Sequence, residues 1–357
     1  MTIVTTKETR QHDDISKLKS PGRIAIVTSK TDGLKETGFG SIETCTAMYR
    51  AIRTKYQDVT FHEVTTKESL NGVLHESPDL VVLCCKYFQD PDTAIKTWFS
   101  EFFAGKGVNF TGSDREHLEF DSNKSKAKTL LQNSGIATAK FFITLPGQYS
   151  EEADLPVPLP LFVKPLDAAN GNGIDENSIV RDFESYRNKV DEVFRLFGDG
   201  VLVEEELSGR EYTVAVLDDP QRQLRFIVPL QISPPKNCKG DRVLGYEAKL
   251  KNEESLSQVS EPLNGELIQF ADRIFTVLGA RDFGRIDIKL DASGIPHFLE
   301  ANLVPGMTPS TSYFPRALFH MAQSELDFLN TTQMTHTDVA LKIVELGLNR
   351  ASLAEVV

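Results

Sequence analysis

Residues 284–307 read GRIDIKLDASGIPHFLEANLVPGM, two runs typical of strands on either side of a DASG turn. Side chains alternate between the faces of a strand, so Arg285 and Asp287 share one face of the first strand. Glu300 and Asn302 share one face of the second strand in the same way. If the hairpin pairs Asp287 with Glu300, all four polar side chains point the same way, whereas a register shifted by one residue separates them.

These four side chains occupy positions where a hairpin usually carries apolar residues. Two carboxylates and an amide are few, hard oxygen ligands, a set that suits Mg²⁺, which keeps water and shares its shell with phosphate oxygens. Arg285 beside them indicates that an anion also binds there. The spacing alone equally allows a solvated strand face with a chance salt bridge.

Composition and charge exclude some classes of function. The chain has 357 residues, which predicts two or three domains, and an ordinary globular composition. Its formal net charge of -12, without a basic stripe, excludes a nucleic-acid partner, while a small anionic ligand needs only a few converging cations. No apolar run reaches transmembrane length and the polar N-terminus carries no secretory signal, so we expect no membrane partner and a cytoplasmic protein.

The cysteines give no sign of a metal site or a disulfide framework. They form no CxxC pair and no zinc spacing, and two of them are adjacent within an apolar run. We expect buried, reduced thiols at Cys45, Cys84, Cys85 and Cys238.

The first part of the chain predicts a parallel α/β sheet. Strand patterns occupy 22–29, 59–64 and 78–88, and a helical pattern covers 41–56 between the first two. A further short strand is expected within 107–114. For the whole chain we expect a flexible arm over 1–22, an N-terminal α/β domain over 23–121, a central subdomain over 122–207 and a C-terminal subdomain over 208–357.

Later segments add helices and one long loop. Helices are expected over 182–197 and 263–278, and Val339, Ile343 and Leu346 are spaced for the apolar face of a last helix. The stretch 237–257 is polar, carries two glycines and has no sustained apolar period, so we expect a long loop without regular structure. It is either a functional lid or a mobile surface loop in which Lys249 occurs by chance.

Two further segments carry groups that suit a nucleotide. Lys164 ends the apolar strand LPLFVK before the loop LDAANGNGI, where Gly171 and Gly173 let backbone N–H groups approach a phosphate. The run 204–206 places three glutamates after a β-branched strand, where a backbone edge can read adenine and a carboxylate can hold ribose hydroxyls. Each segment alone also fits a bland interpretation, an ordinary strand end or an acidic loop.

Taken in order, these segments resemble the ATP-grasp superfamily and, within it, the D-alanine–D-alanine ligase family. The resemblance covers about residues 122–315, over half of the chain. It rests on NKSKAKTLLQNSGIATA, LFVKP, VLVEEELSGREYTVAVL, GYEAKL and GRIDIKLDASGIPHFLEANLVPGMTPSTS. It implies an ATP-grasp fold of three α/β domains, with the nucleotide between the central and C-terminal domains.

The resemblance also implies a role for each matching residue. For ATP it implies Lys124 and Lys164 on the α- and β-phosphates, Glu204, Glu205, Glu206 and Leu207 on adenine, Glu211 on the ribose, and Lys249 on the γ-phosphate. For the metal it implies Asp287, Glu300 and Asn302 around two Mg²⁺ ions, with Mn²⁺ as the alternative. Arg285 would stabilise an acyl phosphate and the tetrahedral intermediate, and Gly306 would bring backbone close to the second substrate.

The activity implied by the resemblance is that of an ATP-dependent carboxylate–amine ligase. Such an enzyme joins small-molecule amino acid or carboxylate substrates through an acyl phosphate and releases ADP and phosphate. A homodimer is expected by analogy with the family.

The sequence departs from the family pattern at positions that shape the binding sites of the two substrates. Leu250 stands where the family has a tyrosine, and Asn170 where it has a serine. The family's Gly-Gly loop is missing, which leaves Glu36 and Glu43 as candidates to bind the first substrate's amino group. Because a lost hydrogen bond changes specificity strongly, the substrates are two D-alanines or, in a specialised ligase, an amino acid and another metabolite such as mycosporine-glycine.

Two other classes of function stay open. One is a nucleotide-binding module without catalysis that regulates or scaffolds, although such a module has no physical need for an Mg²⁺ cluster. The other is a small-molecule phosphotransferase, which would release a stable phosphorylated product in place of an amide.

Overall fold

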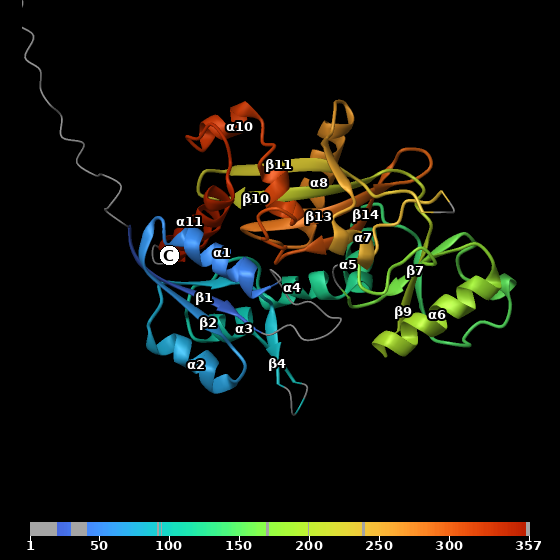
Figure 1. The fold of residues 1–357 in the computed structure, drawn as a ribbon, viewed down its shortest axis with the longest axis horizontal. Helices are drawn as coiled ribbons and strands as arrows, with labels where there is room; N and C mark the ends of the chain where they lie inside the picture. The colour runs from blue at the N-terminus through green and yellow to red at the C-terminus, as the bar shows by residue number, and fades with distance from the viewer. Residues whose placement is uncertain are drawn as a thin grey trace, which may run out of the picture.

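The computed structural model describes residues 20–29, 41–90, 93, 95–168, 171–198, 200–237 and 240–354. In Figure 1 the N-terminal strands (blue), the strands of the middle of the chain (green) and the C-terminal strands (yellow to orange) occupy three regions. The predicted arm over 1–22 lies almost entirely outside the described residues. The domain limits given above stay a prediction.

The first sheet is parallel, as the strand–helix–strand pattern predicts, with the order β2-β1-β3. Its strands are β1 (Ser20–Thr28), β2 (Tyr56–Glu63) and β3 (Leu80–Leu83), and its helices are α1 (Ile42–Ile52), α2 (Lys67–His75) and α3 (Phe99–Gly105). Along β1, Ile24 and Ile26 pack into one core and Ala25 and Val27 into another, because helices cover both faces of the sheet. The expected burial of the cysteines is confirmed for those described, Cys45, Cys84 and Cys85. Cys238 lies outside the described residues.

The prediction of a strand within 107–114 was wrong. Only Phe110 forms a bridge, to Val81 of β3. Gly107 and Gly112 on either side have positive φ angles of 67° and 81°, which turn the chain out of an extended course. The amide of Gly112 donates to Asp282 Oδ2 at 2.8 Å, a partner outside the first sheet.

A second, antiparallel sheet has the order β6-β9-β7-β8. Its strands are β6 (Phe141–Thr144), β7 (Leu161–Pro165), β8 (Ile179–Val180) and β9 (Val201–Glu205), and its helix is α6 (Phe183–Phe197). Helices α4 (Arg115–Ser122) and α5 (Lys124–Asn133) precede this sheet in the chain and contact β14 (Pro296–Asn302) of the third sheet. The predicted helix over 182–197 is confirmed as α6. Asp182 caps its N-terminus, Gly198 in the left-handed region ends it, and its apolar face packs on the sheet.

The third sheet is also antiparallel and has the order β12-β11-β10-β13-β14. Its strands are β10 (Glu211–Asp219), β11 (Leu224–Ser233), β12 (Ser255–Gln258), β13 (Phe283–Leu290) and β14 (Pro296–Asn302). Helix α8 (Leu263–Val277) confirms the predicted helix and packs its buried residues against this sheet.

The expectation of no regular structure over 237–257 was wrong. Helix α7 (Tyr246–Lys251) lies within it, and strand β12 begins in it. The helix sequence YEAKLK consists mostly of good helix formers, and β12 gains order by pairing with β11 from Leu230 to Ser233. Backbone pairing at a sheet edge needs no apolar period, so the sequence pattern carried no sign of this strand.

The last helix brings the C-terminal end of the chain onto the N-terminal sheet. Helix α11 (His336–Ala354) packs against α1, and Val339, Ile343 and Leu346 are buried as predicted. The remaining elements are β4 (Tyr87–Gln89), β5 (Lys96–Trp98), the 3-10 turn Glu152–Asp154, α9 (Tyr313–Leu318) and α10 (Gln323–Phe328). No helix of the described part of the chain is both long and apolar enough to cross a membrane.

Candidate active site

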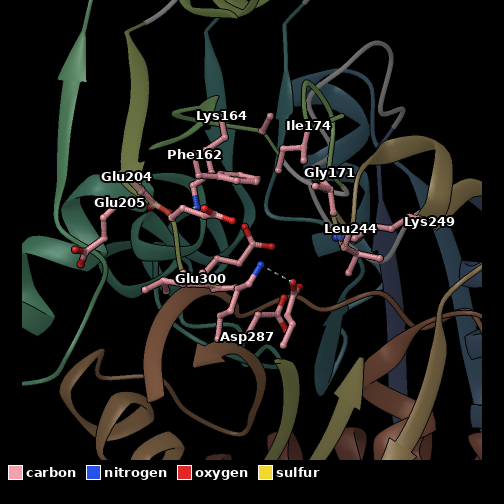
Figure 2. A pocket seen from close by; sticks show the side chains of 17 residues that line it. Phe162, Lys164, Gly171, Ile174, Glu204, Glu205, Leu244, Lys249, Asp287 and Glu300 are labelled. Carbon is pink, nitrogen blue, oxygen red and sulfur yellow. Dashed lines mark ion pairs between the residues drawn. The ribbon is translucent and has the colours of Figure 1, made fainter. Parts of the chain in front are cut away.

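The hairpin β13–β14 has the register that gathers its polar side chains. Arg285 pairs with Asn302, and Asp287 pairs with Glu300, before a bulge that follows Asp287. Residues paired across two strands share a face of the sheet, so the four side chains point the same way. Figure 2 shows Asp287 and Glu300 directed into one space.

That space is a pocket between the hairpin and strands β7 and β9 (Figure 2). It is lined by Phe162, Lys164, Ala168, Gly171, Ile174, Glu204, Glu205, Glu206, Leu207, Glu211, Val243, Leu244, Lys249, Asp287, Lys289, Leu299 and Glu300. Most of the predicted nucleotide and metal residues are therefore brought together. A mixture of apolar walls and a few converging charges is typical of a small-molecule site.

Three buried lysines meet two glutamates on one side of the pocket. Glu204 lies between two of them, with Lys128 Nζ 3.0 Å from Oε1 and Lys164 Nζ 3.0 Å from Oε2. Lys124 Nζ lies 3.6 Å from Glu300 Oε2. Burial lowers the pKa of Lys128 to about 8, although Glu204 opposes the change. Within this group of five side chains the lysines outnumber the glutamates by one, so their ammonium groups can meet the oxygens of a phosphate.

The three consecutive glutamates have different environments. Glu204 is buried, and although burial favours its neutral form, Lys128 and Lys164 hold its pKa below the ordinary value. Glu205 points away from the centre of the pocket in Figure 2, and its Oε1 accepts a hydrogen bond from the amide of Lys140 at 2.8 Å. Glu204 is therefore the one of the three whose carboxylate pairs with the lysines.

Glu300 is ionised in this setting. Burial raises its pKa, but nearby cations outweigh that effect and hold the pKa at about 2. They are, in decreasing order of effect, Lys124, Lys249, Lys164 and Arg285.

Asp287 is held from two sides. Arg285 contacts both of its oxygens, Nε to Oδ1 at 3.0 Å and Nη2 to Oδ2 at 2.8 Å. The hydroxyl of Thr213 on the neighbouring strand donates to Oδ1 at 2.8 Å. The guanidinium of Arg285 also lies 5.5 Å from the centre of the Tyr313 ring.

The donor set fits a cation that a ligand helps to hold. Glu300 supplies an ionised carboxylate beside Asp287, and the side-chain oxygen of Asn302 is a third possible ligand. The amide nitrogen of Asn302 is buried without a hydrogen-bond partner among the described residues, so it can donate to an anion such as a phosphate. Within the same residues, no group of three or more His, Cys, Asp or Glu side chains could hold a metal alone. The residues therefore suit Mg²⁺ that takes further ligands from phosphate and water.

Glu211, at the start of β10, also lines the pocket. Burial raises its pKa, and Lys289 Nζ approaches its Oε2 at 4.0 Å. A carboxylate with a cation at this distance can accept hydrogen bonds from hydroxyl groups.

Two backbone segments, 171–174 and 245–246, meet near Lys249, and we call this contact the roof of the pocket. Tyr246, which begins α7, donates its amide to the carbonyl of Ile174 at 3.3 Å. A Cβ atom on Gly171 would lie 3.1 Å from the backbone of Gly245 and Tyr246, so the two loops touch through glycine backbone. Lys249 on α7 lines the pocket beneath this contact.

A small cluster of polar residues lies behind Arg285. The hydroxyl of Tyr313 donates to Glu254 Oε1 at 2.7 Å, and Glu254 belongs to the turn between α7 and β12. Gly306 lies beside Ser312, whose Oγ would be 2.7 Å from an added Cβ. The segment that carries Lys249 is thus joined to the ring that supports Arg285.

Sequence reasoning missed several residues of this site. Lys128 is four residues from Lys124, so both lie on one face of α5, and this spacing was a usable signal. Thr213, Lys289 and Tyr313 gave no such signal, because their positions depend on strand pairing and on the return of the chain. The predictions for Glu36, Asn170 and the side chain of Leu250 fall outside the described residues.

Comparison with known families gives a match over more than half of the chain. A family model described as D-ala D-ala ligase C-terminus matches residues 130–329. The chain is 26% identical over 301 residues to the D-alanine–D-alanine ligase of Methylacidiphilum infernorum, covering 83% of this chain and 89% of that protein. It is 32% identical over 219 residues to the D-alanine–D-alanine ligase of Mannheimia succiniciproducens, covering 59% of this chain and 66% of that protein.

Solved structures show the same fold. The D-alanine–D-alanine ligase of Bacillus anthracis, solved in complex with ATP, has a TM-score of 0.69 at 18% identity and covers 94% of this chain and 100% of its own. The ligase of Coxiella burnetii has a TM-score of 0.63 at 17% identity, with 94% and 97% covered. The predicted ATP-grasp fold is confirmed.

Proposed function

The chain belongs to the D-alanine–D-alanine ligase family, a family of ATP-dependent enzymes that form C–N bonds, and from this premise we propose its reaction. ATP phosphorylates the carboxylate of one substrate to an acyl phosphate. The amine of a second substrate then attacks the acyl carbon and expels phosphate, so that an amide, ADP and phosphate are the products.

One observation carries the proposal: the hairpin register sets Asp287 and Glu300 across a pocket from Lys164 and Lys249. This arrangement supplies cations for a triphosphate and carboxylates for the metal that accompanies it. A catalytically silent module would need neither the ionised Glu300 nor the buried Arg285.

The nucleotide lies along the pocket, with its adenine on the segment 204–207 and its phosphates toward the hairpin β13–β14. Glu211 receives the ribose hydroxyls. Lys124 and Lys164 neutralise the α- and β-phosphates, and Lys249 reaches the γ-phosphate from α7. The backbone roof at Gly171 excludes water from the transferred phosphoryl group.

Asp287, Glu300 and Asn302 are the residues that would hold two Mg²⁺ ions, or Mn²⁺ in their place. When bound, such ions screen the negative charge of the phosphates and favour attack at phosphorus. The chain itself keeps Glu300 ionised through the lysines around it, so the carboxylate is ready at neutral pH.

Arg285 acts on the acyl transfer. Its guanidinium is buried, is held in place by Asp287, and rests over the Tyr313 ring. A cation fixed in this way opposes the negative charge that develops on the acyl oxygen when the amine attacks. Gly306, beside Ser312, brings backbone close to the second substrate.

The substrates are amino acids, and we propose that the pair differs from two D-alanines. Leu250 next to Lys249 offers no hydroxyl where the family pattern has a tyrosine. A specialised ligase that joins an amino acid to another metabolite, such as mycosporine-glycine, accounts for this change. The protein acts as a homodimer by analogy with the family.

A substrate screen tests the proposal. Purified protein with ATP and Mg²⁺ is offered D- and L-amino acids, singly and in pairs, and mycosporine-type acceptors. Phosphate release that depends on a pair, with a product mass equal to the sum of both substrates minus water, is the expected result. A stable phosphorylated product would indicate a phosphotransferase instead, and nucleotide binding without turnover on any pair would indicate a regulatory module.

A further inference from the structure

Lys128 is a fully buried lysine that does not line the pocket. It lies one turn after Lys124 on α5, and its Nζ is 3.0 Å from Glu204 Oε1. The same Nζ donates to the carbonyl of Phe298 at 3.1 Å. Burying an ammonium group is costly, so its position calls for a charge that it compensates.

Glu204 carries the negative charge that Lys128 compensates, and Glu204 also pairs with a second lysine. Its second oxygen lies 3.0 Å from Nζ of Lys164, the residue proposed to meet the phosphates. Without a positive charge at Lys128, the whole charge of Glu204 would fall on Lys164 and neutralise it. With Lys128 charged, the group of two lysines and one glutamate keeps a net charge of about +1.

We propose that Lys128 is a positioning residue for polyphosphate binding: by compensating Glu204, it leaves the ammonium of Lys164 available to the nucleotide. The proposal rests on the nucleotide site proposed above. Lys128 acts through Glu204 and touches no part of the ligand. It changes the contribution of the phosphates to the binding energy, and comparing ADP with adenosine separates this from any effect on the adenine that Glu204 transmits.

The protonation state of Lys128 gives this role a pH dependence. The charged groups that act on it from other elements are Glu204 from β9, Lys164 from β7 and Glu300 from β14. Lys124 lies one turn earlier on its own helix. Burial brings the pKa of Lys128 to about 8. Phosphate binding should therefore weaken as the pH rises from 7 to 9, because Lys128 loses its charge and Glu204 then pairs with Lys164 alone.

The experiment compares ADP with adenosine. Calorimetry gives the affinity of each ligand for the wild type, Lys128→Met and Lys128→Arg. The ratio of ADP affinity to adenosine affinity isolates the contribution of the phosphates to binding. We expect Lys128→Met to lower this ratio about tenfold, on the scale of one charge-assisted contact, and Lys128→Arg to retain it. Adding Glu204→Gln to Lys128→Met should restore the ratio, since Lys164 then has no carboxylate partner.

A pH series on the wild type keeps the test valid if Lys128→Met does not fold. The ratio of ADP affinity to adenosine affinity should fall between pH 7 and 9 in the wild type and stay level in Lys128→Arg. A change in the protonation of ADP itself affects both proteins equally, so the variant controls for it. An equal loss of ADP and adenosine in Lys128→Met, or the same pH dependence in wild type and Lys128→Arg, would overturn the proposal. Absence of ADP binding by the wild type would instead refute the nucleotide site.

Discussion

Glu300 shows how the charge of one side chain in this pocket depends on its neighbours. Burial alone would favour the protonated form, but the surrounding cations hold the pKa at about 2. The sequence identified Glu300, Asp287 and Arg285, because a strand's alternation places them without any knowledge of the rest of the fold. The sequence reasoning did not identify Lys128: its spacing from Lys124 was available, but the pairing of Lys128 with Glu204 depends on how the chain folds.

Replacing Glu300 tests the metal assignment. Glu300→Gln keeps the shape of the side chain and removes its charge, so we expect turnover at saturating Mg²⁺ to fall at least about a hundredfold, or about 3 kcal/mol. Circular dichroism should show an unchanged fold. The exposed Glu116→Gln on α4 serves as a matched control, and activity of Glu300→Gln equal to that control would reject the assignment.

Lys128 should also affect stability in a pH-dependent way. Its pKa in the folded protein is about 8, below the ordinary 10.5, so the unfolded chain binds more protons between these values. The free energy of unfolding of the wild type should therefore rise, relative to Lys128→Met, as the pH increases from 8 to 10.5. The gain is at most about 3 kcal/mol. Urea unfolding of both proteins across this range measures it, and identical pH slopes would contradict the prediction.

Local signals explain which elements the sequence reveals. The hairpin β13–β14 and helix α6 carry their own turn and cap residues, and both were predicted. The order within 237–257 was missed because α7 and β12 depend on contacts with Ile174 and β11, far away in the sequence. This segment now has a definite geometry, in which Lys249 is carried by a short helix under the roof of the pocket.

Lys249 should matter for the chemical step more than for ADP binding. ADP lacks the γ-phosphate that this lysine is proposed to meet, so Lys249→Ala should lower turnover by about tenfold or more while ADP affinity changes little. If α7 acts as a lid, an ATP analogue with Mg²⁺ should protect it from limited proteolysis. Equal cleavage of 240–254 with and without the nucleotide would argue against a lid.

The contact between Gly171 and the α7 loop can be tested with a matched pair of glycines. Gly171 and Gly294 both have positive φ angles, 75° and 85°, so alanine at either position strains the backbone by about 1 kcal/mol. A Cβ on Gly171 would crowd Gly245 and Tyr246, whereas a Cβ on Gly294 meets open space. We expect alanine at either position to lower thermal stability, more so at Gly171, but turnover to fall only in Gly171→Ala. Equal activities would show that the roof contact is dispensable.

At the scale of the molecule, the three larger sheets are joined by segments that return over long distances in the sequence. The parallel order of the first sheet and the ATP-grasp fold were predicted from strand–helix alternation and from ordered motifs. The contacts that join the parts were not, because they link residues such as Phe110, Asp282 and Arg350 that have no pattern in common. Helix α11 is the clearest case, since it packs on α1 at the opposite end of the chain (Figure 1).

The junction at Arg350 should be a main determinant of global stability. Its guanidinium bonds Asp282, with Nη1 2.6 Å from Oδ1, and the carbonyl of Phe110, while Asp282 also accepts the amide of Gly112. The Asp282 side chain is only 4% exposed, so Arg350→Met leaves a buried carboxylate without its cation, which should lower the free energy of unfolding by about 3–5 kcal/mol.

Arg222 provides the matched control for that change. It also pairs with acidic groups, Asp219 and Glu345, but its own side chain is 44% exposed, so Arg222→Met should cost about 1 kcal/mol or less. Urea unfolding of the two variants measures the difference. Because α11 reaches the nucleotide pocket only through the sheets, Arg350→Met should keep its affinity for ADP at temperatures where it remains folded. A loss no larger than that of Arg222→Met would show that the packing of α11, rather than this ion pair, holds the two ends of the chain together.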